Sequence, residues 1–206
     1  MIKLNNQRNG KKTVLLINAH LKYPNRSEGK LNASLQEVAR DYFKSDGYLV
    51  LETKVEDGYD PVEEVRKHLQ ADIIILQTPI NWFGAPWIYK KYADELFEAG
   101  HAKREFLEGD GRSRQDPTRQ YGSGGKLHGK RFMVSATWNA PGEAFGNSDQ
   151  NLMKGKTTAD LLLNITSNYA FCGAGILPGF NSFDVVKNGT PKKDLENYRA
   201  FLANII

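Results

Sequence analysis

The sequence predicts a doubly wound α/β fold, in which a five-stranded parallel sheet carries helices on both faces. Two kinds of segment alternate from residue 13 to the end of the chain. One kind is short and continuously apolar, as in Ile73–Leu76, which is typical of a strand buried on both faces. The other kind has apolar residues at helical spacing, as in Leu31–Lys44. Strands that alternate with helices favour a parallel sheet joined by crossover helices.

The expected elements follow from these patterns and from the residues at their ends. Strands are expected at residues 13–17, 48–51, 72–77 and 131–137, with a fifth around 176–177. Helices are expected at 31–44, 61–69, 87–99, 158–171 and 191–206. Gly47 fits a helix end and Asp60 fits an N-cap. Pro79 has no N–H for a sheet ladder and should end the third strand, whereas Pro86 suits a first helical position.

The length and the apolar segments bound the class of protein. A chain of 206 residues suits one domain, and we expect 1–12 to be a flexible lead-in and 13–206 to be that single domain. The lead-in lacks the apolar region of a signal peptide, and no later segment is apolar enough over a sufficient length to span a bilayer. The only cysteine, Cys172, lies in an apolar stretch and fits an inert thiol in a reducing compartment. We therefore expect a cytoplasmic protein without a membrane partner.

Charge and residue spacing argue against two further classes. The net charge of +4 is basic, but it is not by itself a nucleic-acid signature, so we expect no nucleic-acid partner. No group of His, Cys and Asp has the spacing of metal ligands, so we expect no metal.

Two aromatic residues follow the third expected strand at its carboxyl end. Trp82 and Phe83 stand in a tight turn between Pro79 and Pro86. In open α/β sheets, ligands bind outside the carboxyl ends of the strands, and pockets are lined by aromatic rings with a few polar groups. The turn therefore predicts a ligand site. The alternative is that the two rings merely cap the hydrophobic core.

Two more loops at carboxyl ends of strands carry suitable groups. The segment Ser27–Ser34 runs into a helix, and helix N-terminal N–H groups bind phosphate, although a plain helix cap is the alternative. It is neither a P-loop nor a Gly-x-Gly-x-x-Gly motif. The segment Thr137–Pro141 adds a ring and an amide. If the strand order is 2-1-3-4-5, the three loops converge on one crevice, and a flat heteroaromatic group such as a flavin fits it.

Three motifs together resemble a known family. They are Pro79–Trp87, Tyr121–Gly125 and Thr137–Pro141, at their spacing in this chain. The chain from Thr13 to the closing helix resembles the bacterial NAD(P)H:quinone oxidoreductases called modulator of drug activity B, within the flavodoxin-like quinone reductases. The resemblance implies a flavodoxin-like fold, bound FAD, NAD(P)H as electron donor, a quinone substrate and a homodimer with the active site at its interface. It implies no catalytic side chain, because flavin N5 is the reacting atom in a two-electron, ping-pong reaction.

The same resemblance implies a set of cofactor-binding residues, drawn from three segments and one isolated tyrosine. The segments would contact the pyrophosphate, the isoalloxazine face and the pyrimidine end of the flavin. The residues are Ser27, Gly29, Leu31, Asn32 and Ser34; Pro79, Ile80, Asn81, Trp82 and Phe83; Tyr121; and Thr137, Trp138, Asn139 and Ala140.

Several readings stay open from the sequence. An FMN-dependent azo- or nitroreductase and an electron-carrier or redox-sensing module on the same fold are the alternative functions. His20 can face a phosphate or ribose, or be solvated. The basic segment 100–129, including Arg112, Arg114 and Arg119, is either a solvated surface or a docking site for a nicotinamide nucleotide phosphate. The expected dimer interface takes its motive from Trp87, Tyr92, Phe97 and Phe145, which a lone domain would not need.

Overall fold

A computed structural model describes residues 10–206, so most of the expected lead-in, residues 1–9, lies outside the described residues. Every strand pairing in the sheet is parallel, and the strand order is β2-β1-β3-β4-β5, with β6 also pairing with β4. The order expected from the sequence is therefore confirmed. The strands are β1 Thr13–Asn18, β2 Leu49–Lys54, β3 Ile73–Pro79, β4 Arg131–Thr137, β5 Gly175–Ile176 and β6 Phe180–Ser182.

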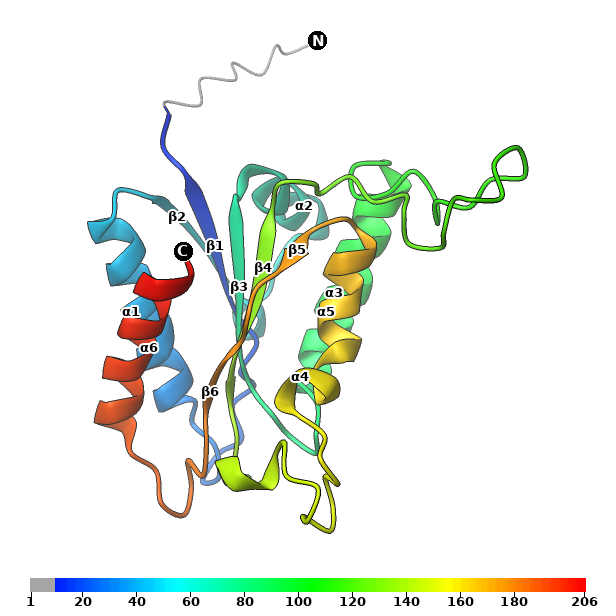
Figure 1. Cartoon of the computed structure of the whole chain (residues 1–206). Coiled ribbons are helices and arrows are strands. Elements are labelled where there is room, and N and C mark those ends of the chain that lie inside the picture. The colour runs from blue at the N-terminus through cyan, green and yellow to red at the C-terminus, as the bar shows by residue number, and fades with distance from the viewer. Residues whose placement is uncertain (1–9) are drawn as a thin grey trace.

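Helices cover both faces of the sheet (Figure 1). The helices are α1 Lys30–Ser45, α2 Pro61–Gln70, α3 Trp87–Ala102, α4 Thr158–Leu161, α5 Leu163–Phe171 and α6 Pro191–Ile205, with short 3-10 turns η1 Val55–Asp57 and η2 Gly142–Ala144. Helices α1 and α6 lie on one face, where Leu35 and Leu202 are fully buried with Val14. Helices α2, α3 and α5 lie on the other face, where Val65 and Leu96 are buried. The two apolar layers hold the sheet on both sides, which explains why its central strands are apolar throughout.

Two expected elements are interrupted. The fifth strand is split into β5 and β6, which both pair with β4. Pro178 lies between them, and proline cannot donate to a sheet ladder. A Cβ on Gly179 would meet the Val134 carbonyl oxygen at 2.9 Å, so the chain passes β4 closely at this point. The helix expected at 158–171 breaks at Leu162, whose φ of −93° and ψ of 6° leave the helical region and divide α4 from α5.

The ends of the elements differ in part from expectation. Asp60 caps α2 as predicted, because its Oδ1 accepts a hydrogen bond of 2.9 Å from the Glu63 N–H. Pro86 is the N-cap of α3 with ψ of 151°, so it stands before the first helical residue and not at it. Strand β2 extends beyond the expected 48–51, since this edge strand is half exposed and continues through polar residues as far as Lys54.

The two edges of the sheet carry different loops. Because the strands are parallel, the loops after β1, β3 and β4 share the carboxyl edge, at the bottom of Figure 1. The segment 103–130 connects α3 to β4 and lies at the opposite, amino edge, at the upper right of Figure 1. That segment carries Tyr121, so within one chain this residue lies at the edge opposite the three loops that were expected to converge on one crevice.

Candidate functional site

The aromatic turn at the carboxyl edge is strained. Asn81 and Gly84 pair with each other, with N···O distances of 2.8 and 3.2 Å in the two directions. Between them Trp82 and Phe83 have φ of 50° and 66°, both in the left-handed region. Two-residue turns of this kind normally carry Asn-Gly, because a side chain with a Cβ costs roughly 1–2 kcal/mol there. Strain of this kind collects at functional sites, where the surrounding structure maintains it.

The strain exposes the two rings. Trp82 is 96% exposed and Phe83 is 49% exposed. Neither ring caps the hydrophobic core, so that alternative reading of the turn is wrong. The neighbouring Ile80 donates its N–H to the Thr137 carbonyl oxygen at 2.9 Å, which ties the turn to the end of β4. The turn therefore holds two flat apolar surfaces outside the sheet edge, where they are free to contact a ligand.

The loop after β1 leads into a helix without a side-chain cap. Gly29, the N-cap of α1, has φ of 76°, and no side chain within residues 10–206 bonds to the cap. The first turn of α1 contains no acidic residue. The first N–H groups of a helix need a partner from outside it, and the positive end of the helix dipole favours an anion. The segment predicted to bind a phosphate therefore has the groups to do so.

His20 lies under this loop and not in solvent. It is 5% exposed, and its Nε2 lies 3.1 Å from the Ser27 Oγ. Burial lowers the pKa of His20 below its usual value, which favours the neutral ring. A Cβ on Gly29 would meet the His20 Nδ1 at 2.5 Å, so the ring packs directly against the helix start. The interpretation that His20 is solvated is therefore wrong, because its ring is buried and packs against the loop at the start of α1.

The Asn32 side chain is turned away from the crevice. It is 5% exposed, its Oδ1 accepts from the Gln77 Nε2 at 2.8 Å, and its Nδ2 donates to the Thr137 Oγ1 at 3.2 Å. The side chains of Asn32 and Thr137 are thus bonded to each other inside the fold, and the contact with a cofactor expected at these two residues stays a prediction. Ser27, Leu31 and Ser34 are half-buried.

Gln77 is a residue that the sequence reasoning missed. It is 2% exposed within the buried strand β3, and its Oε1 has no hydrogen-bond partner in the part of the chain that the structure describes. The available signal was an amide inside an otherwise apolar strand, since buried polar side chains are seldom placed without a partner.

The turn after β4 differs from the expectation at its aromatic residue. Trp138 is 2% exposed, its Nε1 donates to the Asn181 Oδ1 at 2.8 Å, and its ring packs edge-on against Phe145. Trp138 therefore belongs to the core and does not place a ring beside the aromatic turn. Asn139 is exposed and Ala140 is half-buried, so these two residues remain at the surface of the crevice.

The segment 103–130 is pinned at its base and presents Tyr121. A Cβ on Gly124 would meet the Gly109 carbonyl oxygen at 2.2 Å, so only glycine allows these two backbones to approach so closely. Tyr121 is 69% exposed, and its ring lies 5.0 Å from that of Phe171. Arg112 lies over the same ring, and its Nε donates to the Asp110 Oδ2 at 2.8 Å. The Arg112 guanidinium is thus already paired, which weakens the phosphate-docking reading at this residue.

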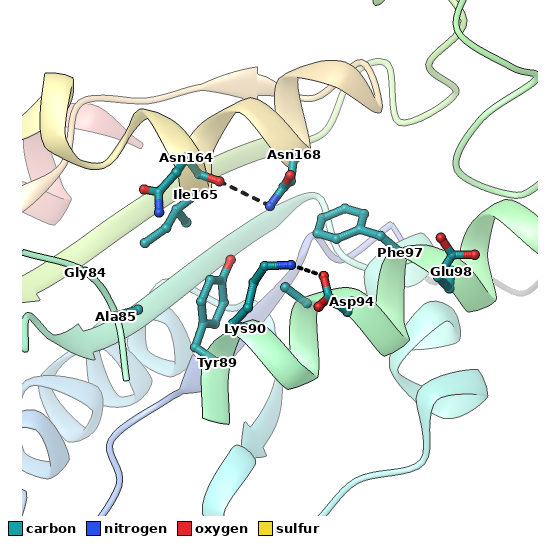
Figure 2. A pocket seen from close by; sticks show the side chains of 11 residues that line it. Gly84, Ala85, Tyr89, Lys90, Asp94, Phe97, Glu98, Asn164, Ile165 and Asn168 are labelled. Carbon is teal, nitrogen blue, oxygen red and sulfur yellow. Dashed lines mark hydrogen bonds and ion pairs between the residues drawn. The ribbon is translucent and has the colours of Figure 1, made fainter. Parts of the chain in front are cut away.

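A groove runs between α3 and α5, on the side of the sheet that α2, α3 and α5 cover. Its volume is about 560 Å³, and Figure 2 shows it lined by Tyr89, Phe97 and Asn168 among others. The Tyr89 hydroxyl is buried with no hydrogen-bond partner within residues 10–206, and burial raises its pKa far above the usual range.

Four aromatic residues were the reason to expect a dimer interface. Of these, Tyr92 is fully buried and Trp87 is 64% exposed.

The remaining aromatic residues of that argument also pack inside the chain. Phe97 is half-buried against Phe106 and Tyr169, and Phe145 packs against Trp138 and Phe183. Tyr92, Phe97 and Phe145 therefore give no reason to expect a dimer interface, because their rings pack within one chain.

The described residues offer neither a reactive thiol nor a cluster of metal ligands. Burial raises the pKa of Cys172 to about 12, so the thiol stays protonated and unreactive. No cluster of His, Cys, Asp or Glu that could hold a metal ion occurs within the described residues 10–206. In the same range, no helix is long and apolar enough to cross a bilayer.

Comparison with known proteins adds to this picture. The family described as having a flavodoxin-like fold matches residues 12–205. NADPH:quinone oxidoreductase MdaB of Haemophilus influenzae is 38% identical over 179 residues, which is 87% of this chain and 92% of that protein. An uncharacterised protein of Schizosaccharomyces pombe is 43% identical over 182 residues, covering 88% of this chain and 90% of that protein.

Solved structures share the fold at lower identity. A candidate quinone reductase of Klebsiella pneumoniae superposes with a TM-score of 0.74 at 22% identity, covering 94% of this chain and 84% of that chain. General stress protein 14 of Treponema denticola, solved in complex with FMN, gives a TM-score of 0.63 at 18% identity, covering 93% and 96% of the two chains. The extent of the family match and the identity to MdaB agree with the sheet order and with the motifs of the sequence. The chain therefore belongs to the flavodoxin-like family that includes the quinone oxidoreductase MdaB.

Proposed function

We propose that this chain is a flavin-dependent NAD(P)H:quinone oxidoreductase. The observation that carries the proposal is the strained turn at the carboxyl edge, which keeps Trp82 and Phe83 exposed at a cost in stability. The name of the relative MdaB, which is an NADPH:quinone oxidoreductase, supports the same activity. The uncapped start of α1 lies at the same edge of the sheet, so one ligand with a flat ring and a phosphate would satisfy both features.

The residues present fit a flavin. A flavin has a flat ring system, for which the exposed rings of Trp82 and Phe83 offer apolar contact, and an anionic tail, for which the first N–H groups of α1 offer partners. When bound, it would supply the hydride chemistry of the reaction. The chain's own residues would hold and orient the ring, while Asn139, which is exposed after β4, can hydrogen-bond to its polar edge.

We propose FAD as the flavin because the loop of residues 19–29 is long enough to add contacts beyond a single phosphate. The likeness to general stress protein 14, which was solved with FMN, makes FMN the competing cofactor. The absorbance spectrum of the purified protein and the mass of the compound that it releases on denaturation decide between them. Release of FMN, with no uptake of added FAD, would contradict the FAD proposal and favour the azo- or nitroreductase alternative.

We further propose that NAD(P)H and the quinone use one site in turn, because the carboxyl edge offers one pair of exposed aromatic rings. Steady-state rates should then give parallel double-reciprocal lines when both substrates are varied. Intersecting lines would indicate a ternary complex and separate sites. A protein that binds flavin but reduces no benzoquinone with either nucleotide would favour the electron-carrier or redox-sensing reading.

We also propose a homodimer in which the Tyr121 segment of one copy completes the crevice of the other. Tyr121 is 69% exposed and is carried at the amino edge, opposite the crevice of its own chain. Light scattering of the flavin-loaded protein should give about twice the chain mass, since closed two-fold pairs are the commonest assembly. An equal mixture of a Tyr121→Ala chain with a Trp82→Asn/Phe83→Gly chain should recover about a quarter of the wild-type rate, because random pairing makes about half of the dimers mixed and one of the two sites in each mixed dimer keeps both parts. No recovery on mixing would contradict the shared site.

A further inference from the structure

Three buried polar side chains are hydrogen-bonded to one another inside the fold, next to the three loops of the carboxyl edge. Asn32 belongs to the first turn of α1, Gln77 to β3 and Thr137 to the end of β4. The Gln77 Nε2 donates to the Asn32 Oδ1 at 2.8 Å, and the Asn32 Nδ2 donates to the Thr137 Oγ1 at 3.2 Å. All three residues are at most 5% exposed. The chain of bonds therefore lies inside the fold and not on the surface of the crevice.

The same bonds join the start of α1 to the aromatic turn. The carbonyl oxygen of Thr137 accepts from the Ile80 N–H at 2.9 Å, and Ile80 is the first residue after β3. A path of hydrogen bonds thus runs from the helix start, through Asn32 and Thr137, to the segment that carries Trp82 and Phe83. Because each bond has a preferred length and direction, the path fixes how far the helix N-terminus lies from the rings, and at what angle.

The network is not explained by stability alone. Burying amide groups costs free energy unless each polar atom finds a partner, and the Gln77 Oε1 has none within residues 10–206. An apolar pair of the same size at positions 32 and 77 would fill the space without that penalty. A polar network that is incompletely satisfied in a central strand is therefore expected to serve a geometric purpose.

We propose that Asn32 and Gln77 are positioning residues, which hold the N-terminus of α1 in register with the aromatic turn so that both ends of one flavin bind together. The inference rests on the proposed function, since it assumes a ligand with a phosphate at one end and a ring at the other. Neither amide side chain touches that ligand. Their contribution is to the coupling between the two halves of the site, because a ligand that spans two well-placed subsites binds more tightly than its parts.

The test compares FAD with its two fragments. Riboflavin carries the ring without a phosphate, and ADP carries the pyrophosphate without the ring. In Asn32→Leu and in Gln77→Leu, the dissociation constant of FAD should rise about tenfold, which corresponds to about 1.4 kcal/mol. The dissociation constants of riboflavin and ADP should change by less than about twofold, because each fragment uses only one half of the site. The double variant should weaken FAD binding no more than Asn32→Leu alone, because Gln77 acts through its hydrogen bond to the Asn32 side chain.

Gln36→Leu is the matched control. Gln36 is a buried amide one turn further along α1, and its Nε2 donates to the Glu52 Oε1 at 2.9 Å, away from β3 and β4. It should leave FAD binding unchanged although it removes a comparable hydrogen bond from the same helix. Circular dichroism and thermal melts of all variants identify any that fail to fold.

The outcomes separate this inference from the proposed function. Weaker binding of ADP or riboflavin in parallel with FAD would mean direct contact or general loss of structure, and would overturn the positioning role. Unchanged FAD binding in Asn32→Leu and Gln77→Leu would overturn it as well, while the proposed function would stand. A wild-type protein that binds neither FAD nor riboflavin would overturn the proposed function and, with it, this inference.

Discussion

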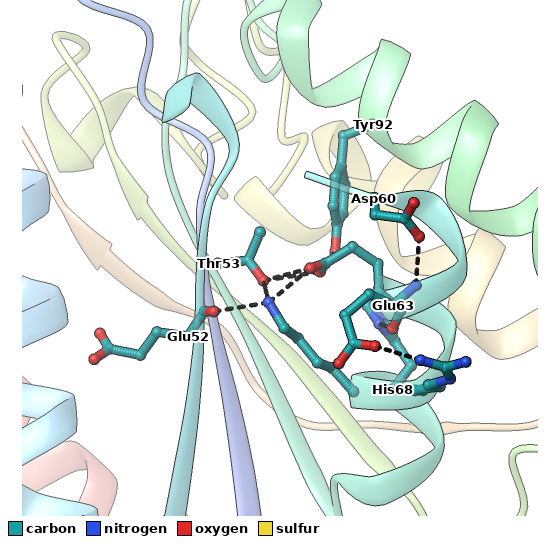
Figure 3. A network of polar contacts seen from close by, with 9 residues as sticks. Glu52, Thr53, Asp60, Glu63, His68 and Tyr92 are labelled. Atoms are coloured by element: carbon teal, nitrogen blue, oxygen red, sulfur yellow. Dashed lines mark hydrogen bonds and ion pairs between the residues drawn. The ribbon is translucent and has the colours of Figure 1, made fainter. Parts of the chain in front are cut away.

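Lowering the pH should destabilise this fold through one buried histidine, His68 of α2. Its Nδ1 donates to the Glu64 carbonyl oxygen at 2.7 Å, and its Nε2 lies 3.1 Å from the Tyr169 hydroxyl, which can donate to it. His68 belongs to the polar network around α2 that Figure 3 shows, together with Thr53 and Tyr92. Both ring nitrogens are thus used by the neutral form, and burial lowers the pKa of His68 from 6.5 to about 4.

The sign and size of the effect follow from this lowered pKa. The unfolded chain takes up a proton near pH 6.5 and the folded chain only near pH 4, so acid favours the unfolded state between these values. The contribution of neutral His68 to the free energy of unfolding is fully present above the pKa of the unfolded chain. It is lost as the pH falls towards the pKa of His68 in the folded chain. The lowered pKa of His68 corresponds to about 3 kcal/mol of unfolding free energy in all. Of this, about 2 kcal/mol should be lost between about pH 7.5 and about pH 5.

Urea unfolding of the wild type and of His68→Gln, measured over this pH range, tests the reasoning. Gln keeps a donor and an acceptor but does not titrate. The variant should be less stable at neutral pH, and its disadvantage should shrink by about 2 kcal/mol on going to about pH 5. Other groups, including His20 with its lowered pKa, titrate in both proteins and cancel in the difference. A constant difference between the two proteins at every pH would show that His68 does not remain neutral in the folded state.

Two further predictions concern the aromatic turn and the buried carboxylate of Glu64 in α2. Replacing Trp82-Phe83 by Asn-Gly should raise the free energy of unfolding by about 1–2 kcal/mol, because it removes the strain of two left-handed residues with large side chains. The same change should abolish quinone reduction. A variant that is less stable than the wild type in thermal melts would contradict the strain argument. Tyr92→Phe should cost about 2 kcal/mol, because the Tyr92 hydroxyl donates at 2.7 Å to the Glu64 carboxylate, which is 1% exposed. The matched Tyr89→Phe, whose hydroxyl has no partner within residues 10–206, should be close to neutral in the same denaturation experiment.

The order of the elements was predictable because it depends on local patterns. Short, mostly apolar runs between turn residues are typical of central strands, and these predicted β1, β3 and β4 to within two residues at each end. Prediction failed where exposure or a break in pairing decides the boundary. The edge strand β2 continues through polar residues that resemble a loop. The expected fifth strand is divided into β5 and β6 at Pro178, which has no N–H to donate to the sheet.

The loops of the site were predictable, but the direction of single side chains was not. A residue at the start of a helix can face the crevice or the sheet, and only its periodicity decides. Asn32 precedes the buried Leu35, Ala39 and Phe43 at helical spacing, so it continues the inner face of α1. That pattern, read one turn earlier, would have placed the amide inside. Trp138 gave no comparable signal, because its position depends on Asn181, which is distant in the sequence.

Tyr121 shows how topology constrains function more than any single motif does. In a parallel sheet, a connection from a helix to the next strand lies at the amino edge, whereas a connection from a strand to the next helix lies at the carboxyl edge. The segment 103–130 joins α3 to β4, so Tyr121 and the aromatic turn belong to opposite edges of one chain. If Tyr121 contacts the flavin, as the family resemblance implies, the proposed dimer would supply that contact from another copy of the chain. Within its own chain the Tyr121 ring packs against Phe171 and lies under the Arg112 guanidinium, and it remains 69% exposed and accessible to a second copy. Strand order and connection type thus support the proposed dimer, although the buried aromatic residues first proposed for its interface do not.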